Sequence, residues 1–310
     1  MTEVAALIAQ GHAQLKQQKA QAALQLFSQA LGLDSNSALA YASRADAYAA
    51  LGDYASALCD FDRAIELDTG AVELIRNRAT ALIKLQHFSE AMADLDRVVI
   101  LRKDLPEAYD ERGQLLSMLG RLADARDDFR RAAELQPTAD RHYRYGVTLS
   151  CLGCYDEALP QFEAAIALNP QHVAALTERG VVQLELGRME LARADFDAAV
   201  QMNPTYHIAW ANRAAYFYLR REWNEMMENA SRAITLTPAY ALSYKLRALA
   251  AKELGRVMEA ITDLEQFLAL EPDAPDREQL ERVLEQLRQE QETGKGRRWV
   301  AKLLRLYRRR

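Results

Sequence analysis

Residues 106–138 read PEAYDERGQLLSMLGRLADARDDFRRAAELQPT. Each half of this stretch carries apolar or small residues three and four positions apart, a spacing that predicts two short helices. Gly120 separates the two halves and Pro137 ends the unit. The same pattern recurs from Val4 to Ala274 in steps of 34 residues, and once of 33. The chain is therefore organised around a repeated pair of helices.

Three positions of the repeat alternate in size. The first is always small: Gly11, Ala45, Ala79, Gly113, Gly146, Gly180, Ala214 and Ala248. The second is small in seven repeats: Ala23, Ala57, Ala91, Ala125, Ala158, Ala192, Met226 and Ala260. The third is large in seven repeats: Phe27, Phe61, Leu95, Phe129, Phe162, Phe196, Ala230 and Leu264. A large side chain can fill the space beside a small one, and the exchange in the seventh repeat conserves volume, which cores tolerate best.

This period and this small-small-large pattern resemble the tetratricopeptide repeat. The resemblance covers residues 1–274 as eight tandem repeats and implies an all-α, right-handed α-solenoid superhelix of antiparallel helix pairs. Residues 275–293 predict a C-terminal capping helix, because leucine and valine gather on one of its faces. Residues 294–310 form a basic amphipathic tail after a flexible Gly-Lys-Gly joint.

Composition and charge limit the cellular locations that fit this chain. No apolar run approaches the roughly 18 residues that a membrane-spanning helix needs, and Met1 to Leu15 lacks the basic start of a secretory signal. Three cysteines suit a reducing compartment. We therefore expect a cytoplasmic protein, peripheral at the membrane if its tail binds lipid. The last sixteen residues carry +8, which leaves −13 for the preceding 294 from a total of −5.

The resemblance implies that the first helix of each repeat lines a concave groove. In repeats three and four its residues are Glu73, Arg76, Asn77, Thr80, Glu107, Asp110, Glu111 and Gln114. In repeats seven and eight they are Ile208, Ala211, Asn212, Tyr218, Leu242, Lys245, Leu246 and Leu249. The groove is thus predicted to have an acidic middle and an apolar C-terminal end. Two interpretations stay open: a partner segment with basic and apolar stretches, or a solvated charged face with an apolar patch covered by the cap.

Arginine stands one position before the first small position in six repeats: Arg44, Arg78, Arg112, Arg179, Arg213 and Arg247. In five of them an aspartate follows sixteen residues later: Asp60, Asp94, Asp128, Asp195 and Asp263. The sixth has Asn229 at that place. Because the two helices are antiparallel, we expect an ion pair within each repeat rather than a charged binding ladder. An exposed pair of this kind contributes about 0–1 kcal/mol.

No catalytic constellation is present. The sequence lacks a phosphate-binding glycine loop, an HExxH pair and a Gly-x-Ser-x-Gly turn. Cys151 and Cys154 have metal-ligand spacing, but the histidines are scattered singly and a structural zinc site needs four ligands. We therefore predict no catalytic residues, metal, cofactor or small-molecule substrate.

The tail, RRWVAKLLRLYRRR, predicts a helix with an apolar face and a basic face. Its candidate contact residues are Arg298, Trp299, Lys302, Leu303, Arg305 and Leu306. Such a helix suits an anionic membrane surface, an acidic protein groove or a nucleic-acid backbone, of which nucleic acid is the least favoured. It also suits a second capping helix. The predicted function is a non-catalytic adaptor that binds a partner protein or peptide in the groove. The alternatives are a membrane-surface tether and a regulatory subunit of a separate enzyme.

Overall fold

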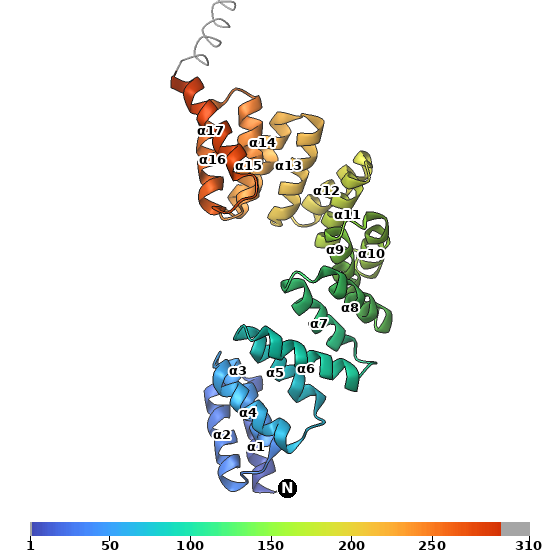
Figure 1. The fold of residues 1–310 in the computed structure, drawn as a ribbon, viewed down its shortest axis with the longest axis vertical. Helices are drawn as coiled ribbons and strands as arrows, with labels where there is room; N and C mark the ends of the chain where they lie inside the picture. The colour runs from blue at the N-terminus through green and yellow to red at the C-terminus, as the bar shows by residue number, and fades with distance from the viewer. Residues whose placement is uncertain (1, 293–310) are drawn as a thin grey trace, which may run out of the picture. The chain divides into compact units, whose positions relative to one another are not determined.

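The computed structural model describes residues 2–292, and within that range the chain is entirely helical (Figure 1). The basic tail, with Arg298, Trp299, Lys302, Leu303, Arg305 and Leu306, lies outside the described residues. The chain forms two compact units, which divide in sequence between Leu152 and Gly153. Within residues 2–292, no helix has both the length and the apolar character to span a membrane.

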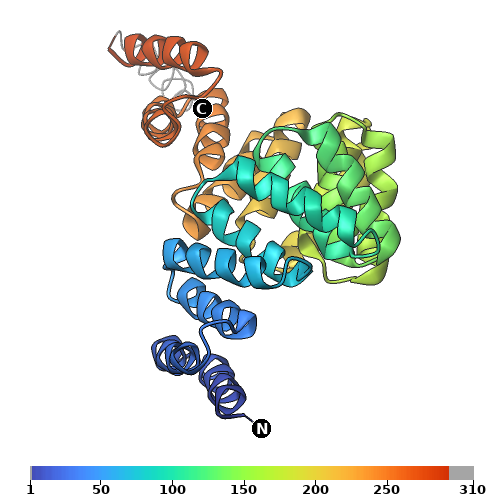
Figure 2. The same ribbon diagram turned by 60° about the horizontal axis from the view of Figure 1, so that its bottom comes forward.

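The first unit contains nine helices among its described residues: α1 (Glu3–Lys16), α2 (Ala20–Leu33), α3 (Ala38–Ala50), α4 (Tyr54–Leu67), α5 (Val72–Lys84), α6 (Phe88–Leu101), α7 (Pro106–Met118), α8 (Leu122–Leu135) and α9 (Ala139–Cys151). The second unit contains, up to residue 292, α10 (Tyr155–Leu168), α11 (Val173–Glu185), α12 (Met189–Met202), α13 (His207–Arg220), α14 (Trp223–Leu236), α15 (Ala241–Glu253), α16 (Val257–Leu270) and α17 (Arg277–Glu292). Inside each unit, consecutive helices pack side by side, and the partners of a repeat run antiparallel (Figure 2). The predicted all-α solenoid of helix pairs is confirmed.

The turn inside each repeat depends on one residue in the left-handed backbone region. These residues recur with the period of the repeat: Gln18, Gly52, Gln86, Gly120, Gly153, Gly187, Arg221 and Gly255. Glycine occupies five of these positions because it has no Cβ to clash with the following carbonyl. Arg221, with φ of 57°, adopts the same conformation at a cost.

The small and large positions meet across each helix pair. A Cβ added to Gly113 would lie 3.0 Å from the Phe129 ring, and one added to Gly180 would lie 2.7 Å from the Phe196 ring. The large side chain therefore occupies the space that the small residue leaves, as the sequence predicts. Met226 and Ala230 of the seventh repeat are both fully buried in one core.

The arginine and aspartate of each repeat form a bidentate pair in all five predicted cases. The arginine Nε donates to the aspartate Oδ2 at 2.6–2.8 Å in Arg44–Asp60, Arg78–Asp94, Arg112–Asp128, Arg179–Asp195 and Arg247–Asp263. The predicted ion pair within each repeat is confirmed in these five repeats. All five aspartates are buried, so the value for an exposed pair does not apply to them.

The sixth arginine behaves differently. Arg213 pairs with Asp197 of the preceding repeat, with 2.8 Å between Nε and Oδ1. The neutral Asn229 side chain instead donates to the Glu225 carbonyl of its own helix at 2.7 Å. Arg112 also reaches back one repeat, to Asp96 at 2.8 Å. The arginines therefore connect neighbouring repeats as well as the two helices within one repeat.

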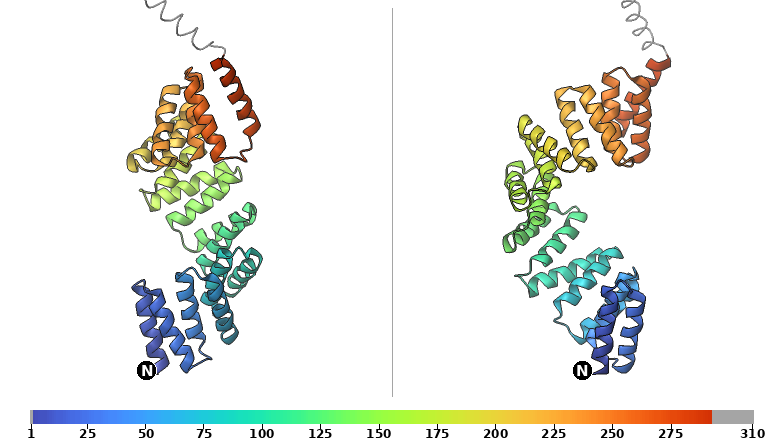
Figure 3. Two further views of the ribbon diagram at one scale, coloured as in Figure 1. Left: turned by 90° about the vertical axis from the view of Figure 1, so that its left-hand side faces the viewer. Right: turned by 180° about the vertical axis from the view of Figure 1, so that it is seen from behind.

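Helix α17 lies against α16 at the end of the described chain (Figure 3). Its buried residues Leu280, Leu284 and Leu287 pack with Leu264 and Phe267 of α16 in one apolar cluster. The opposite face of α17 is charged. The helix therefore covers apolar surface that the last repeat would otherwise expose.

Candidate functional site

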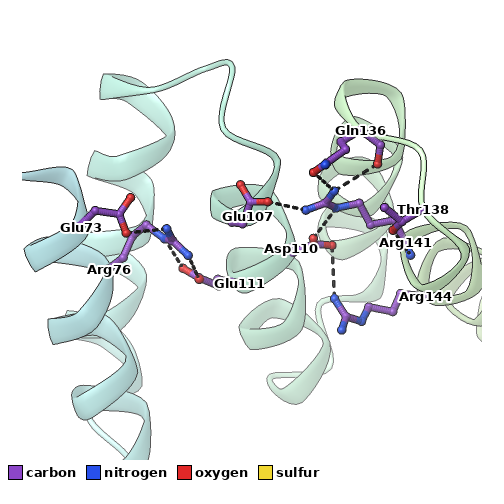
Figure 4. A network of polar contacts seen from close by, with 9 residues as sticks. All are labelled: Glu73, Arg76, Glu107, Asp110, Glu111, Gln136, Thr138, Arg141 and Arg144. Atoms are coloured by element: carbon purple, nitrogen blue, oxygen red, sulfur yellow. Dashed lines mark hydrogen bonds and ion pairs between the residues drawn. The ribbon is translucent and has the colours of Figure 1, made fainter. Parts of the chain in front are cut away.

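Within each unit, the first helices of successive repeats contact one another and form what we call the first-helix face of that unit. The candidate site lies on the first-helix face of the first unit. In the first unit this face carries a polar network across α5, α7 and α9 (Figure 4). Arg76 of α5 donates to Glu73 of its own helix at 2.9 Å and, through two nitrogens, to Glu111 of α7. These bonds tie the third and fourth repeats together at their side chains.

Arg141 of α9 holds the other half of the network. Its Nε donates to Asp110 Oδ2 at 2.7 Å, and a terminal nitrogen donates to Glu107 Oε1 at 2.8 Å. The same guanidinium also donates to the backbone carbonyl of Gln136 at 3.2 Å. Arg144, one turn further along α9, lies 3.5 Å from Asp110 Oδ1. Asp110 is thus buried between two arginines.

The network offsets most of the charge that the acidic residues bring. Glu73, Glu107, Asp110 and Glu111 contribute four carboxylates, and three arginines pair with them. Burial raises the pKa of Glu107, but hydrogen bonds from its own backbone amide and from Arg141 outweigh that effect and lower it below its ordinary value. The predicted acidic middle is therefore a surface of fixed, paired charges of both signs.

Asn77 belongs to a neighbouring polar contact on the same face. Its Nδ2 donates to Asp46 Oδ1 of α3 at 3.1 Å. Burial raises the pKa of Asp46, with the Asn77 hydrogen bond and the nearby His12 acting against that effect. Asn77 itself is exposed, so it stays accessible to solvent.

The predicted residues of the second unit separate into buried and exposed groups. Lys245 forms an ion pair with Asp276 before α17 and lies 5.6 Å from the Phe267 ring centre. Leu249 is partly buried and packs against the apolar core cluster of the second unit, whereas Tyr218 is exposed. Asn212 is half-buried. Lys245 thus contributes to the attachment of the last helix, and the exposed part of the predicted apolar end is smaller than the sequence suggested.

The sequence did not predict the role of two arginines in the network of Figure 4. Arg141 and Arg144 belong to repeat five, and only the spacing of 31 and 34 residues back to Asp110 and Glu107 signals the contact.

The remaining geometry concerns metal ligands and cavities. Among residues 2–292, no three or more His, Cys, Asp or Glu side chains are grouped as metal ligands. Two surface cavities, of about 280 and 320 Å³, are lined mainly by the arginine–aspartate pairs and neighbouring charged residues.

The protein-family profiles that match this chain all carry the same family description. Profiles described as "Tetratricopeptide repeat" match residues 8–72, 106–139, 152–207 and 213–285. No curated protein matches the sequence.

Solved structures agree on the fold. A tetratricopeptide repeat protein from Parabacteroides merdae is 17% identical with a TM-score of 0.67, over 80% of this chain and 97% of that one. A chain of the APC/C hetero-tetramer Cut9-Hcn1 is 17% identical with a TM-score of 0.63, over 91% and 55%. YrrB, described as a TPR protein with an unusual peptide-binding site, is 24% identical with a TM-score of 0.53, over 59% and 95%. At these identities the likeness establishes the fold alone.

Proposed function

This chain belongs to the tetratricopeptide repeat family, and we propose that it is a non-catalytic adaptor that holds a segment of a partner protein along the first-helix face. The observation that carries the proposal is the network of Figure 4. Its charges are fixed by bidentate and bridging contacts between helices of one unit.

A surface of this kind suits a polar protein segment. Glu73, Glu107 and Arg144 each keep part of their side chain exposed while the paired groups beneath hold them in place. Groups that are already ordered lose little conformational entropy when a partner binds. YrrB, of the same fold, is described as having a peptide-binding site, which makes a protein segment the reasonable partner class here.

The proposal includes a division of the chain: eight repeats in residues 1–274, a capping helix in 275–293 and a separate tail in 294–310. The burial of Leu280, Leu284 and Leu287 against the last repeat supports the cap. A cytoplasmic location is also part of the proposal.

The test compares two charge reversals in one repeat. Glu73 on α5 and Glu90 on α6 are 70% and 68% exposed, so Glu73→Lys and Glu90→Lys make the same chemical change on different helices. The full chain and both variants serve as bait in native lysate, with captured proteins quantified by mass spectrometry. Loss of partners with Glu73→Lys alone supports binding along the first-helix face. Equal retention by both variants, or equal loss, contradicts it.

A further inference from the structure

Arg247, the arginine of the eighth repeat, has one nitrogen without a close hydrogen-bond acceptor. Its Nε and Nη2 each donate to the Asp263 carboxylate at 2.7 Å. The remaining nitrogen, Nη1, lies 3.4 Å from the Ser231 hydroxyl oxygen. An ordinary N–H···O hydrogen bond measures about 2.7–3.2 Å, so this contact is long. Among residues 2–292, Nη1 therefore keeps most of its capacity to donate.

The third and fourth repeats show which group the eighth repeat lacks. In both, Nη1 of the arginine donates to an aspartate that stands 16 residues earlier in the chain. Arg78 bonds in this way to Asp62 at 2.7 Å, and Arg112 bonds to Asp96 at 2.8 Å. The eighth-repeat arginine has a serine hydroxyl at the same spacing. It therefore has one carboxylate partner where the other two arginines have two.

A surface cavity of about 320 Å³ lies beside this guanidinium. Arg247 and Asp263 line it together with three residues of α16, namely Met258, Glu259 and Thr262. The Arg247 side chain is 28% exposed, so a ligand that enters the cavity can reach it.

The guanidinium is fixed in place before any ligand binds. The Asp263 side chain that accepts two of its hydrogen bonds is only 4% exposed. On another side, the Tyr244 ring centre lies 5.8 Å from Arg247 Cζ. The Ser231 hydroxyl beside Nη1 can donate its own proton to a further acceptor. Groups that are already ordered lose little conformational entropy on binding, so the pair is ready to receive an acceptor.

The charges around the cavity favour one class of ligand. Asp263 is paired with Arg247, and Glu259 lies 3.7 Å from Arg256, so the spare capacity is that of a donor. A basic ligand would face the guanidinium and gain no acceptor from Nη1. A phosphate group carries about −1.5 to −2 charges, and the two acidic side chains would repel it more strongly than a carboxylate. A carboxylate matches the group that the third and fourth repeats have at this place.

We propose that Arg247 and Ser231 bind the carboxylate of an aspartate or glutamate side chain in a partner protein. Met258, which is 57% exposed, offers apolar contact to the methylene groups of that side chain. One charged hydrogen bond is too weak to hold a small free acid, so the carboxylate belongs to a larger ligand. The inference goes beyond the proposed function, because these residues lie outside both the predicted groove and the network of Figure 4.

The test adds a short peptide of alternating glutamate and alanine to the ¹⁵N-labelled full chain and follows the backbone amide signals by NMR, which detects weak binding. The matched peptide carries glutamine in place of glutamate and so lacks the charge. The matched variants are Ser231→Asp and Thr235→Asp. Thr235 is exposed one turn further along α14. Both changes add one negative charge to this helix, but only Ser231→Asp places it beside Arg247.

We expect the glutamate peptide to shift the amide signals of Ser231, Arg247 and Thr262, and the glutamine peptide to leave them in place. Ser231→Asp should raise the dissociation constant read from these signals by about tenfold, the loss of one charged hydrogen bond. Thr235→Asp should leave it within about twofold. Equal weakening by the two aspartate variants overturns the proposal. Shifts that leave α14 and α16 unaffected, as binding to the basic tail alone would, also overturn it.

A third peptide, of alternating phosphoserine and alanine, tests the choice of anion. It should shift the same signals with a higher dissociation constant than the glutamate peptide. A lower one would identify phosphate as the ligand and overturn the assignment to a carboxylate. The capture experiment with Glu73→Lys tests the first-helix face of the other unit, so the adaptor function stands or falls separately.

Discussion

The ion pair between Arg112 and Asp128 offers a quantitative test of how the repeats are held together. Arg112→Met removes the guanidinium and keeps most of the aliphatic volume. In the folded chain it leaves Asp128 without the two bonds of 2.8 and 2.7 Å that it accepts. Because the Asp128 side chain is only 7% exposed, water cannot replace those bonds fully.

The expected cost lies between two limits. Breaking a fully buried pair by removing one partner costs about 3–5 kcal/mol, and an exposed pair contributes about 0–1 kcal/mol. The Arg112 side chain is 23% exposed, which places the pair between these limits. We expect Arg112→Met to lower the free energy of unfolding by about 2–3 kcal/mol. A double-mutant cycle with Asp128→Asn should give a favourable coupling energy of about 1–2 kcal/mol.

Urea denaturation followed by circular dichroism measures the loss, and hydrogen exchange in α7 and α8 shows whether it is local, since repeat arrays need not unfold in two states. Arg121→Met is the matched control. Arg121 pairs with Asp124 in the same repeat, but its side chain is 55% exposed, so its loss should cost less than about 0.5 kcal/mol. If both methionine variants lose the same stability, burial of the aspartate does not strengthen the pair and the reasoning fails.

Three further changes test other parts of the fold. Gly180→Ala should destabilise by about 1–3 kcal/mol because its Cβ would clash with Phe196, whereas Gly32→Ala, with open space around its Cβ, should stabilise by about 0.5–1 kcal/mol; urea denaturation giving one sign for both would contradict this. Arg221→Gly should raise stability by about 0.5–1 kcal/mol, since relief of the left-handed backbone exceeds the added entropy of glycine, and an unchanged urea midpoint would count against it. Burial raises the pKa of Glu178 in the folded chain, so its proton is held more tightly there and stability falls as pH rises from about 4 through the higher folded value. Glu178→Gln should therefore stabilise the protein at pH 7 and lose that advantage at pH 4, and equal gains at both would be inconsistent with this assignment.

The fold could be predicted from the sequence because the same pattern of small and large residues recurs in successive repeats. Gly113 and Phe129 alone would be weak evidence that two helices pack together. A small residue followed sixteen positions later by a large one recurs in most repeats, so one substitution such as Met226 does not hide the pattern. The arginine–aspartate pairing was predictable for the same reason. Its strength was not, because the sequence does not show that the aspartate is buried while the arginine remains near the surface.

The candidate site was harder to predict because its contacts join different repeats. Glu107 and Asp110 read as acidic when repeats three and four are considered alone, and Arg141, which pairs with both, is supplied by the next repeat. The repeat pattern fixes where each backbone position lies. It does not determine which long side chain reaches a neighbour 31 or 34 residues away, since that depends on rotamers and on competing partners.

The pairing of charges in the network of Figure 4 bears on how selectively it can bind a partner. Each of Glu73, Glu107, Asp110 and Glu111 has an arginine partner, so a bound segment adds contacts to groups that are already satisfied. Contacts to satisfied groups discriminate weakly between partners, because losing one leaves the protein no worse than before. Under the proposed adaptor function, the paired network is therefore suited to general affinity for polar segments rather than to the choice among them.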